Sequence, residues 1–265
     1  MWAYDFMRHA LFAGLIIATV CGVVSVFVVL RRTAFAAHAL GHMSLTGAAG
    51  AVILGIPTIV GQLVLNLMAA FVMGLMGDKI KKNDLAVGVV LAFVLGCGAY
   101  FLFLFQSGYA GGVMSILFGN ILAVSVDQIW ILSMIAILVI MSLIVFARPL
   151  IFSSIDPTLA ESKNISTSVL AIVFFIIIAF TVSMACQIVG ALLVFVMLII
   201  PGAIAVQWGD CIYKIMLISI LVANFAVVVA LIIAYYFDLP VSFCITTLLS
   251  LVYCLGLLKN RFYSI

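Results

Sequence analysis

The sequence predicts an all-α integral membrane protein, a bundle of about nine transmembrane helices, with eight to ten allowed by the pattern. Hydrophobic residues make up 68% of the 265 residues and charged residues only 7%, whereas soluble domains carry about 25% charged residues. The mean hydropathy is +1.50. Apolar runs of the roughly 20 residues needed to cross a bilayer recur along nearly the whole chain. Residues 1–265 are therefore expected to form a single transmembrane domain without a separate soluble one.

The predicted helices are the apolar stretches between short polar breaks. Two assignments are ambiguous, because 168–207 is almost continuous and because 112–126 also fits a partial or re-entrant helix. Pro57 and Pro201 are each expected to bend or end a helix, since proline lacks the backbone N–H. The nine spans cover residues 10–30, 36–54, 59–76, 86–105, 128–147, 168–186, 190–207, 215–237 and 241–258.

Lysine and arginine concentrate in alternate loops. Because short cytoplasmic loops carry the excess of positive charge, the N-terminus is predicted outside and the C-terminus in the cytoplasm, in the inner (plasma) membrane of the cell. Only Arg8 then lies on the outer side, and no basic patch interleaved with aromatics indicates a nucleic acid partner. The predicted cytoplasmic clusters are Arg31/Arg32, Lys79/Lys81/Lys82, Arg148/Lys163, Lys214 and Lys259/Arg261.

Two histidines, His38 and His42, stand four residues apart inside an apolar stretch. An ionisable side chain at membrane depth is costly and normally faces a cavity or a partner. Helical positions four apart share one face, with Cβ atoms about 5–6 Å apart, so both imidazoles can bind one first-row divalent ion such as zinc. Alternatively, both only make hydrogen bonds between helices. The spacing alone does not distinguish metal binding from hydrogen bonding between helices.

Four amide side chains also fall inside predicted spans, and their oxygens can extend a hydrophilic path for an ion. Hydrogen bonding between helices is the better explanation for them, because membrane proteins commonly use polar side chains in this way. The four candidates are Gln62, Asn66, Gln187 and Asn224.

The sequence contains no Gly-x-x-x-x-Gly-Lys-Ser/Thr loop to hold a nucleotide phosphate. Any ATP hydrolysis that drives transport is therefore expected on another subunit. The histidines are separated by Ala39, Leu40 and Gly41, which differs from the His-Glu-x-x-His signature of zinc proteases. An enzyme is the least favoured class, and no covalently bound cofactor is expected.

The longest polar stretch is the predicted cytoplasmic loop at 148–167. Asp156 is suited to cap a helix and Pro157 to occupy its first position. The loop is therefore expected to contain a short surface helix that begins at this pair.

Four blocks of the sequence, taken together, resemble the permease family of ATP-binding-cassette importers for zinc, manganese or iron. The resemblance covers nearly the whole chain, and the blocks occur in the family's order. They are 29–35 (Val-Leu-Arg-Arg-Thr-Ala-Phe) with 39–42 (Ala-Leu-Gly-His), 117–125 (Leu-Phe-Gly-Asn-Ile-Leu-Ala-Val-Ser), 156–160 (Asp-Pro-Thr-Leu-Ala), and 189–193 (Val-Gly-Ala-Leu-Leu) running into 199–203 (Ile-Ile-Pro-Gly-Ala).

The resemblance implies a transmembrane core made with a second copy of the permease. It also implies two cytoplasmic ATP-binding subunits and an extracytoplasmic metal-binding protein that delivers the ion. The loop at 148–167 would then be the coupling element that docks on an ATPase. The residues that match this element are Asp156, Pro157, Ala160 and Glu161.

Members of the family usually carry Gly-Asp-x-x-x-His where this chain has Ala37, His38 and, four residues later, His42. His42 matches the family's histidine, whereas His38 replaces a carboxylate. Manganese prefers oxygen ligands and imidazole suits zinc, so the expected transported ion is zinc first and manganese or iron second. The alternatives are a proton-coupled secondary transporter that uses both histidines and a structural membrane scaffold in which they only pack.

Overall fold

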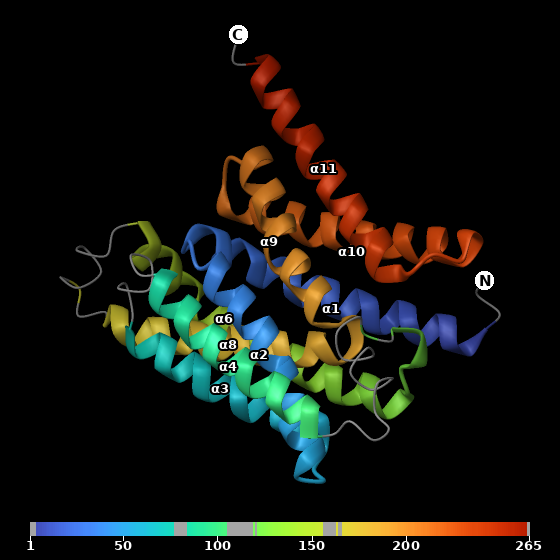
Figure 1. Cartoon of the computed structure of the whole chain (residues 1–265). Helices are drawn as coiled ribbons and strands as arrows, with labels where there is room; N and C mark the ends of the chain where they lie inside the picture. The colour runs from blue at the N-terminus through green and yellow to red at the C-terminus, as the bar shows by residue number, and fades with distance from the viewer. Residues whose placement is uncertain are drawn as a thin grey trace.

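The computed structural model describes residues 4–76, 84–104, 119, 121–155, 163 and 166–263. All regular elements within these ranges are helical, comprising nine α-helices and one short 3-10 helix (Figure 1). Each predicted span coincides with one of the nine to within a few residues, except where α6 extends further, so the predicted fold class is confirmed. In chain order they are α1 (Asp5–Leu30), α2 (Ala34–Ile53), α3 (Thr58–Met76), α4 (Asp84–Leu104), η2 (Ile121–Ala123), α6 (Val126–Ile155), α8 (Thr167–Val189), α9 (Ala191–Trp208), α10 (Ile212–Phe237) and α11 (Val241–Tyr263).

The outer surface of the described bundle is suited to lipid. Eight of its helices are long and apolar enough to cross a membrane, and α2 is not among them. Large apolar side chains point outward on the peripheral helices, for example Phe93 on α4 at 72% exposure and Met134 on α6 at 71%. Such surfaces are rare on soluble monomers. The chain is therefore a multi-pass membrane protein.

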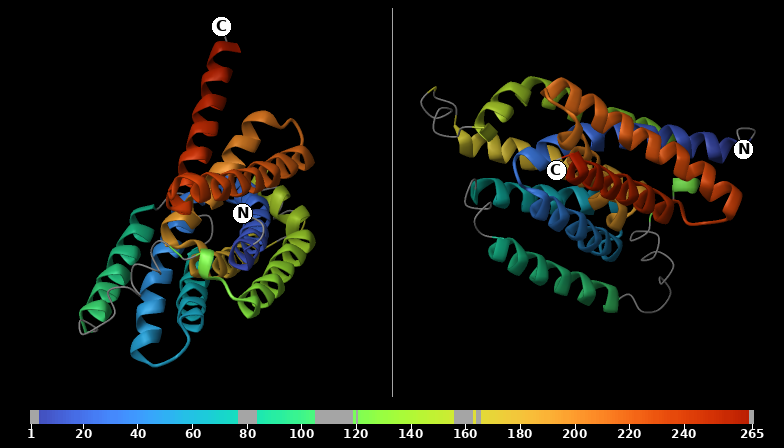
Figure 2. Two further views of the ribbon diagram at one scale, coloured as in Figure 1. Left: turned by 90° about the vertical axis from the view of Figure 1, so that its right-hand side faces the viewer. Right: turned by 90° about the horizontal axis from the view of Figure 1, so that it is seen from above.

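Helix α2 lies inside the bundle, in contact with α3, α4, α8 and α9. Its polar residues and glycines explain why its hydropathy is low for a membrane span. The glycines also allow close packing, since a Cβ atom placed on Gly47 would lie 2.5 Å from the carbonyl oxygen of Gly61 on α3. Peripheral elements have fewer neighbours, and α11 projects from the bundle while α4 lies at its edge (Figures 1 and 2).

The nearly continuous apolar stretch at 168–207 is divided at Gly190, as the sequence suggested. Gly190 has φ 89° and ψ 153°, a region that is essentially accessible only to glycine. The chain therefore ends α8 and begins α9 without an intervening loop.

The two prolines behave differently. Pro57 lies in the turn between α2 and α3, which confirms the expected helix end. Pro201 lies inside α9, so no helix ends there. The Ser25 hydroxyl on α1 accepts a hydrogen bond from the N–H of Gly202 at 2.7 Å and donates one to the carbonyl of Ile199 at 3.3 Å. A neighbouring helix thus satisfies the backbone near the proline, which is how membrane helices tolerate this residue.

Helix α6 is longer than predicted, so the proposed start of the 148–167 loop was wrong. The helix continues through Pro149 to Ile155. Leu150 and Ser153 are buried in this extension. Their packing offsets the single backbone hydrogen bond that proline removes, and tertiary packing of this kind is not visible in local sequence.

Candidate functional site

The described structure places both histidines on the one open stripe of α2. Between Ala36 and Ala49 every residue of this helix is buried except His38, His42 and Leu45. These three positions are spaced by four and three residues, so they form one face. A helix in contact with α3, α4, α8 and α9 thus presents a partly exposed face that carries its two ionisable side chains.

The two imidazoles lie against each other. Their ring centroids are 4.5 Å apart and the rings are perpendicular. His38 also contacts Phe195 from α9, whose ring centroid is 4.3 Å away with the planes at 60°. Phe195 thus limits the space available to His38, and the site combines side chains from α2 and α9.

This geometry is compatible with two ligands to one metal ion. A zinc–imidazole bond is about 2.0–2.1 Å long, so small rotations of rings at this separation can aim one nitrogen of each at a common point. No group of three or more His, Cys, Asp or Glu side chains is placed to hold a metal within the described ranges. Among the described residues, the pair thus provides two candidate nitrogen ligands and no third ligand of these types.

Small residues and a helix break bring α8 and α9 up to the histidine helix. Gly41, between the two histidines in sequence, lies beside the α8–α9 junction, and a Cβ atom placed on it would lie 3.6 Å from the carbonyl oxygen of Ala191. The Cys186 thiol on α8 donates to the Gly41 carbonyl at 3.9 Å. The break at Gly190 is thus what sets Phe195, five residues further on, against His38.

Asn66 connects helices and does not join the histidines. Its amide nitrogen donates to the hydroxyls of Ser44 on α2, at 2.5 Å, and Ser183 on α8, at 2.9 Å. Ser44 is two residues after His42, which is about 200° around the helix, so Asn66 contacts a different side of α2 from the one that carries His42. Gln62, one turn earlier on α3, is also buried. Their amide oxygens have no hydrogen-bond partner among the described residues.

The remaining two amide candidates lie elsewhere. Asn224 on α10 donates to the Thr19 hydroxyl on α1 at 3.1 Å, and so connects two other helices. Gln187 on α8 lines a small cavity of about 50 Å³ together with Gln128 of α6. The structure brings none of the four amides to the histidine pair, and their part in an ion path stays a prediction.

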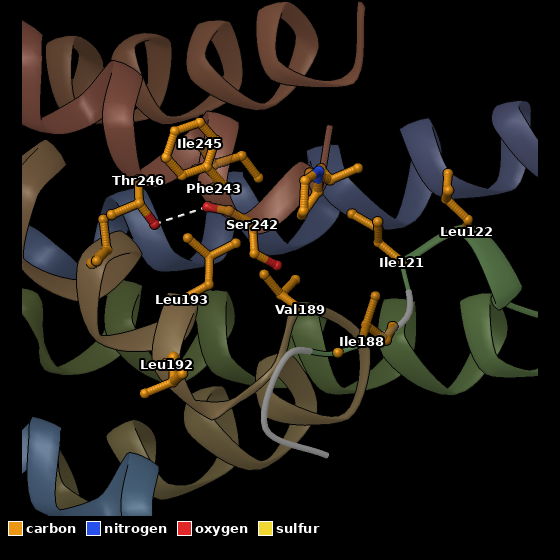
Figure 3. Close-up of a pocket in the computed structure, with 14 residues that line it drawn as sticks. Ile121, Leu122, Ile188, Val189, Leu192, Leu193, Ser242, Phe243, Ile245 and Thr246 are labelled. Atoms are coloured by element: carbon orange, nitrogen blue, oxygen red, sulfur yellow. Dashed lines mark hydrogen bonds between the residues drawn. The ribbon is translucent and has the colours of Figure 1, made fainter. Parts of the chain in front are cut away.

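A larger cavity, of about 650 Å³, lies where η2, the α8–α9 junction and the start of α11 meet (Figure 3). Its lining is mostly apolar, with Val189 and Leu193 pointing into it. The Thr246 hydroxyl at its edge donates to the Ser242 carbonyl at 2.8 Å. A lining of this kind offers almost nothing to replace the hydration shell of a divalent ion, so the histidine face is the better candidate.

The predicted coupling residues Asp156, Pro157, Ala160 and Glu161 lie outside the described residues, and most of the predicted partial helix at 112–126 does too. Nothing in the local sequence indicated a role for Phe195. The sequence also did not show that Arg31, one of the predicted cytoplasmic charges, is buried at the end of α1, with 4% of its surface exposed. The contact of Phe195 with His38 and the burial of Arg31 both result from packing between segments that are far apart in the chain.

Known proteins similar to this chain are transport proteins. The profile of the ABC 3 transport family matches residues 3–260. The manganese import system permease protein ScaB of Streptococcus parasanguinis is 30% identical over 91% of this chain and 86% of its own length. The manganese transport system membrane protein MntC of Halalkalibacterium halodurans is 32% identical over 77% of this chain and 70% of its own length.

Among solved structures, PsaBC from Streptococcus pneumoniae in complex with Fab has a similar fold. The TM-score is 0.84 at 25% identity, and the match covers 96% of this chain and 91% of the other. These matches confirm the resemblance that the four sequence blocks indicated. The chain belongs to the ABC 3 transport family.

Proposed function

We propose that this chain is the permease subunit of an ATP-driven importer of a divalent metal ion, and that His38 and His42 bind the ion as it passes. The observation that carries the proposal is the pair of imidazoles, with ring centroids 4.5 Å apart, on the partly exposed face of a helix that is otherwise buried between Ala36 and Ala49. The family match and the two relatives named as proteins of manganese import or transport systems support it.

In this proposal, each histidine contributes one neutral ring nitrogen to the ion. Two protein ligands, with water in the other positions, bind more weakly than the closed four-ligand shell of a structural site. Weak binding suits passage, because an ion must leave the site as well as enter it. Phe195 shields one side of His38, and so reduces the water that reaches this imidazole.

We propose manganese as the first candidate cargo, because two of the relatives described above are named as proteins of manganese import or transport systems. The expectation that zinc comes first finds no support in these relatives. Zinc is the second candidate because His38 stands where the family usually has an aspartate, and nitrogen ligands suit zinc better than manganese.

The proposed assembly contains a second copy of the permease, cytoplasmic ATP-binding subunits and an extracytoplasmic metal-binding protein, in the plasma membrane. ATP hydrolysis then occurs on the partner subunits and not on this chain. The proposed orientation, with the N-terminus outside, rests on the positive charges at alternate helix ends. It places the segment with Asp156 and Ala160 in the cytoplasm, where it can dock on an ATPase.

The test is uptake of manganese and zinc by proteoliposomes that contain the permease and its ATPase subunits. His38→Ala and His42→Ala are each expected to lower ATP-driven uptake at least about tenfold, as loss of roughly 1.4 kcal/mol of binding would. His9→Ala is the matched control, because His9 is the third histidine of the chain and lies in α1 near its start.

Normal uptake by the double His38→Ala/His42→Ala variant would refute the role of the pair. Uptake that follows a proton gradient and needs no ATP would instead favour a secondary transporter. A complex that moves neither ion would favour a structural scaffold.

A further inference from the structure

Arg31 is a buried arginine that the proposed ion path does not use. It is the residue at the end of α1, three positions before α2 begins at Ala34. Only 4% of its surface is exposed, although arginine is almost never fully buried unless it is paired. The next residue, Arg32, is exposed, so burial is specific to Arg31 at this helix end.

The guanidinium of Arg31 joins three helices. Its Nη1 donates to the Ser153 hydroxyl on α6 at 2.9 Å. Its Cζ lies 5.2 Å from the ring centroid of Phe174 on α8. A planar guanidinium can donate in its plane and stack on a ring with its face, which an ammonium cannot do in the same geometry.

The turn after Arg31 is fixed by hydrogen bonds of the Schellman type. The N–H of Arg32 bonds to the carbonyl of Val29 at 3.1 Å, and that of Thr33 bonds to the carbonyl of Val28 at 3.0 Å. Arg32 has φ 54°, in the left-handed region that this motif requires. A displacement of Arg31 is thus carried directly into the start of α2, about 6 Å along the helix axis from His38.

At the other end, Ser153 belongs to the last turns of α6, next to the predicted coupling segment. The ring of its neighbour Phe152 contacts Lys163, which follows that segment in the chain. The Lys163 Nζ atom lies 5.3 Å from the Phe152 ring centroid. Residues that flank 156–161 on both sides are therefore anchored at the C-terminal end of α6, where Arg31 also binds.

We propose that Arg31 is a positioning residue that links the cytoplasmic coupling segment to the histidine helix. In this inference, which rests on the proposed function, ATPase closure moves the end of α6, and the Arg31–Ser153 contact transmits the movement to α2 and its imidazoles. Arg31 acts through these contacts and does not touch the transported ion.

The experiment uses the complete complex in proteoliposomes and measures metal uptake per ATP hydrolysed, together with the unfolding temperature of each variant. Arg31→Gln is expected to lower this ratio about tenfold, a size typical of coupling between sites, while ATP hydrolysis persists. Arg31→Lys should restore only part of the ratio, because it keeps the charge but not the planar geometry. Arg32→Gln is the matched control, since it removes the adjacent charge from an exposed position.

Ser153→Ala is the second variant, because it removes the acceptor without a large change in volume. It should lower the ratio with little change in unfolding temperature, and it decides the matter if Arg31→Gln does not fold. A folded Ser153→Ala complex with the wild-type ratio would overturn the inference while leaving the proposed function intact. If the wild-type complex itself shows no ATP-driven uptake, the proposed function fails and this inference fails with it.

Discussion

Replacement of Gly47 by alanine is expected to push α2 and α3 apart and destabilise the protein. A Cβ atom on Gly47 would lie 2.5 Å from the carbonyl oxygen of Gly61 and 2.9 Å from its carbonyl carbon. Both atoms belong to the backbone of α3, so no side-chain rotation can relieve the contact. The helices must separate locally by about 1 Å to restore ordinary van der Waals distances.

The matched control is Gly50→Ala on the same helix. A Cβ atom there would lie 3.5 Å from a ring carbon of Phe101, which is an ordinary contact with a side chain. Alanine favours a helix over glycine by roughly 0.5–1 kcal/mol, and overpacking costs about 1–3 kcal/mol. Gly50→Ala should therefore be neutral or slightly stabilising. For Gly47→Ala both contacted atoms are backbone, so the overpacking cost is taken as about 2–3 kcal/mol, and subtracting a gain in helix propensity of about 1 kcal/mol leaves a loss of roughly 1–2 kcal/mol.

Thermal unfolding of the purified protein in detergent, followed by circular dichroism, measures the difference. A loss of this size corresponds to a midpoint roughly 2–8 °C below that of the wild type. If Gly47→Ala unfolds at or above the wild-type temperature, together with Gly50→Ala, the close approach of α2 and α3 is not a determinant of stability and the reasoning is refuted.

Three further predictions concern other contacts. Asn66→Leu should cost about 1 kcal/mol in the same unfolding assay, because two hydrogen bonds between helices are lost; an unchanged midpoint would contradict this. Gly202→Ala should destabilise by about 1–3 kcal/mol, because its Cβ atom would lie 2.5 Å from the Ser25 hydroxyl; a more stable variant would contradict the α1–α9 packing. The backbone N–H of Lys214 and, next, that of Tyr213 lower the pKa of the exposed Cys211 thiol. Its thiolate fraction at neutral pH thus exceeds that of an ordinary cysteine. A membrane-impermeant maleimide should therefore label Cys211 from the cytoplasmic side only, with Cys211→Ser as the control. Labelling of Cys211 in intact cells would contradict the proposed orientation.

The local sequence was sufficient for most helices, because apolar runs of the right length have few alternatives in a bilayer. The break at Gly190 was visible as a glycine inside a long apolar run. The end of α6 was not, because Arg148 and Pro149 are typical of a loop, whereas burial of Leu150 and Ser153 keeps this segment helical. The helix around Pro201 likewise depends on a distant residue. The Ser25 hydroxyl, which bonds to the backbone next to this proline, is 176 positions away from it in the chain.

Within the candidate site, the i, i+4 spacing of His38 and His42 predicted a shared face. Spacing could not show that this face is the open stripe of a buried helix, or that Phe195 covers one of the imidazoles. The spacing also could not show that Asn66 lies away from His38 and His42, because all three residues stand inside apolar stretches of the sequence. Only the orientation of α2 in the folded bundle shows that Ser44 faces Asn66 while His42 points to a different side.

The sequence by itself determined that this chain spans a membrane as helices, that His38 and His42 share one helix face, and to which family it is similar, since composition, spacing and short motifs are local properties. The tertiary structure decided which polar side chains meet, which hydrophobic ring lies on a histidine, and that a presumed loop arginine is buried between three helices. These features depend on contacts between segments far apart in the chain, and such contacts are set by close packing of helices, in which a single Cβ atom changes the distance between neighbours.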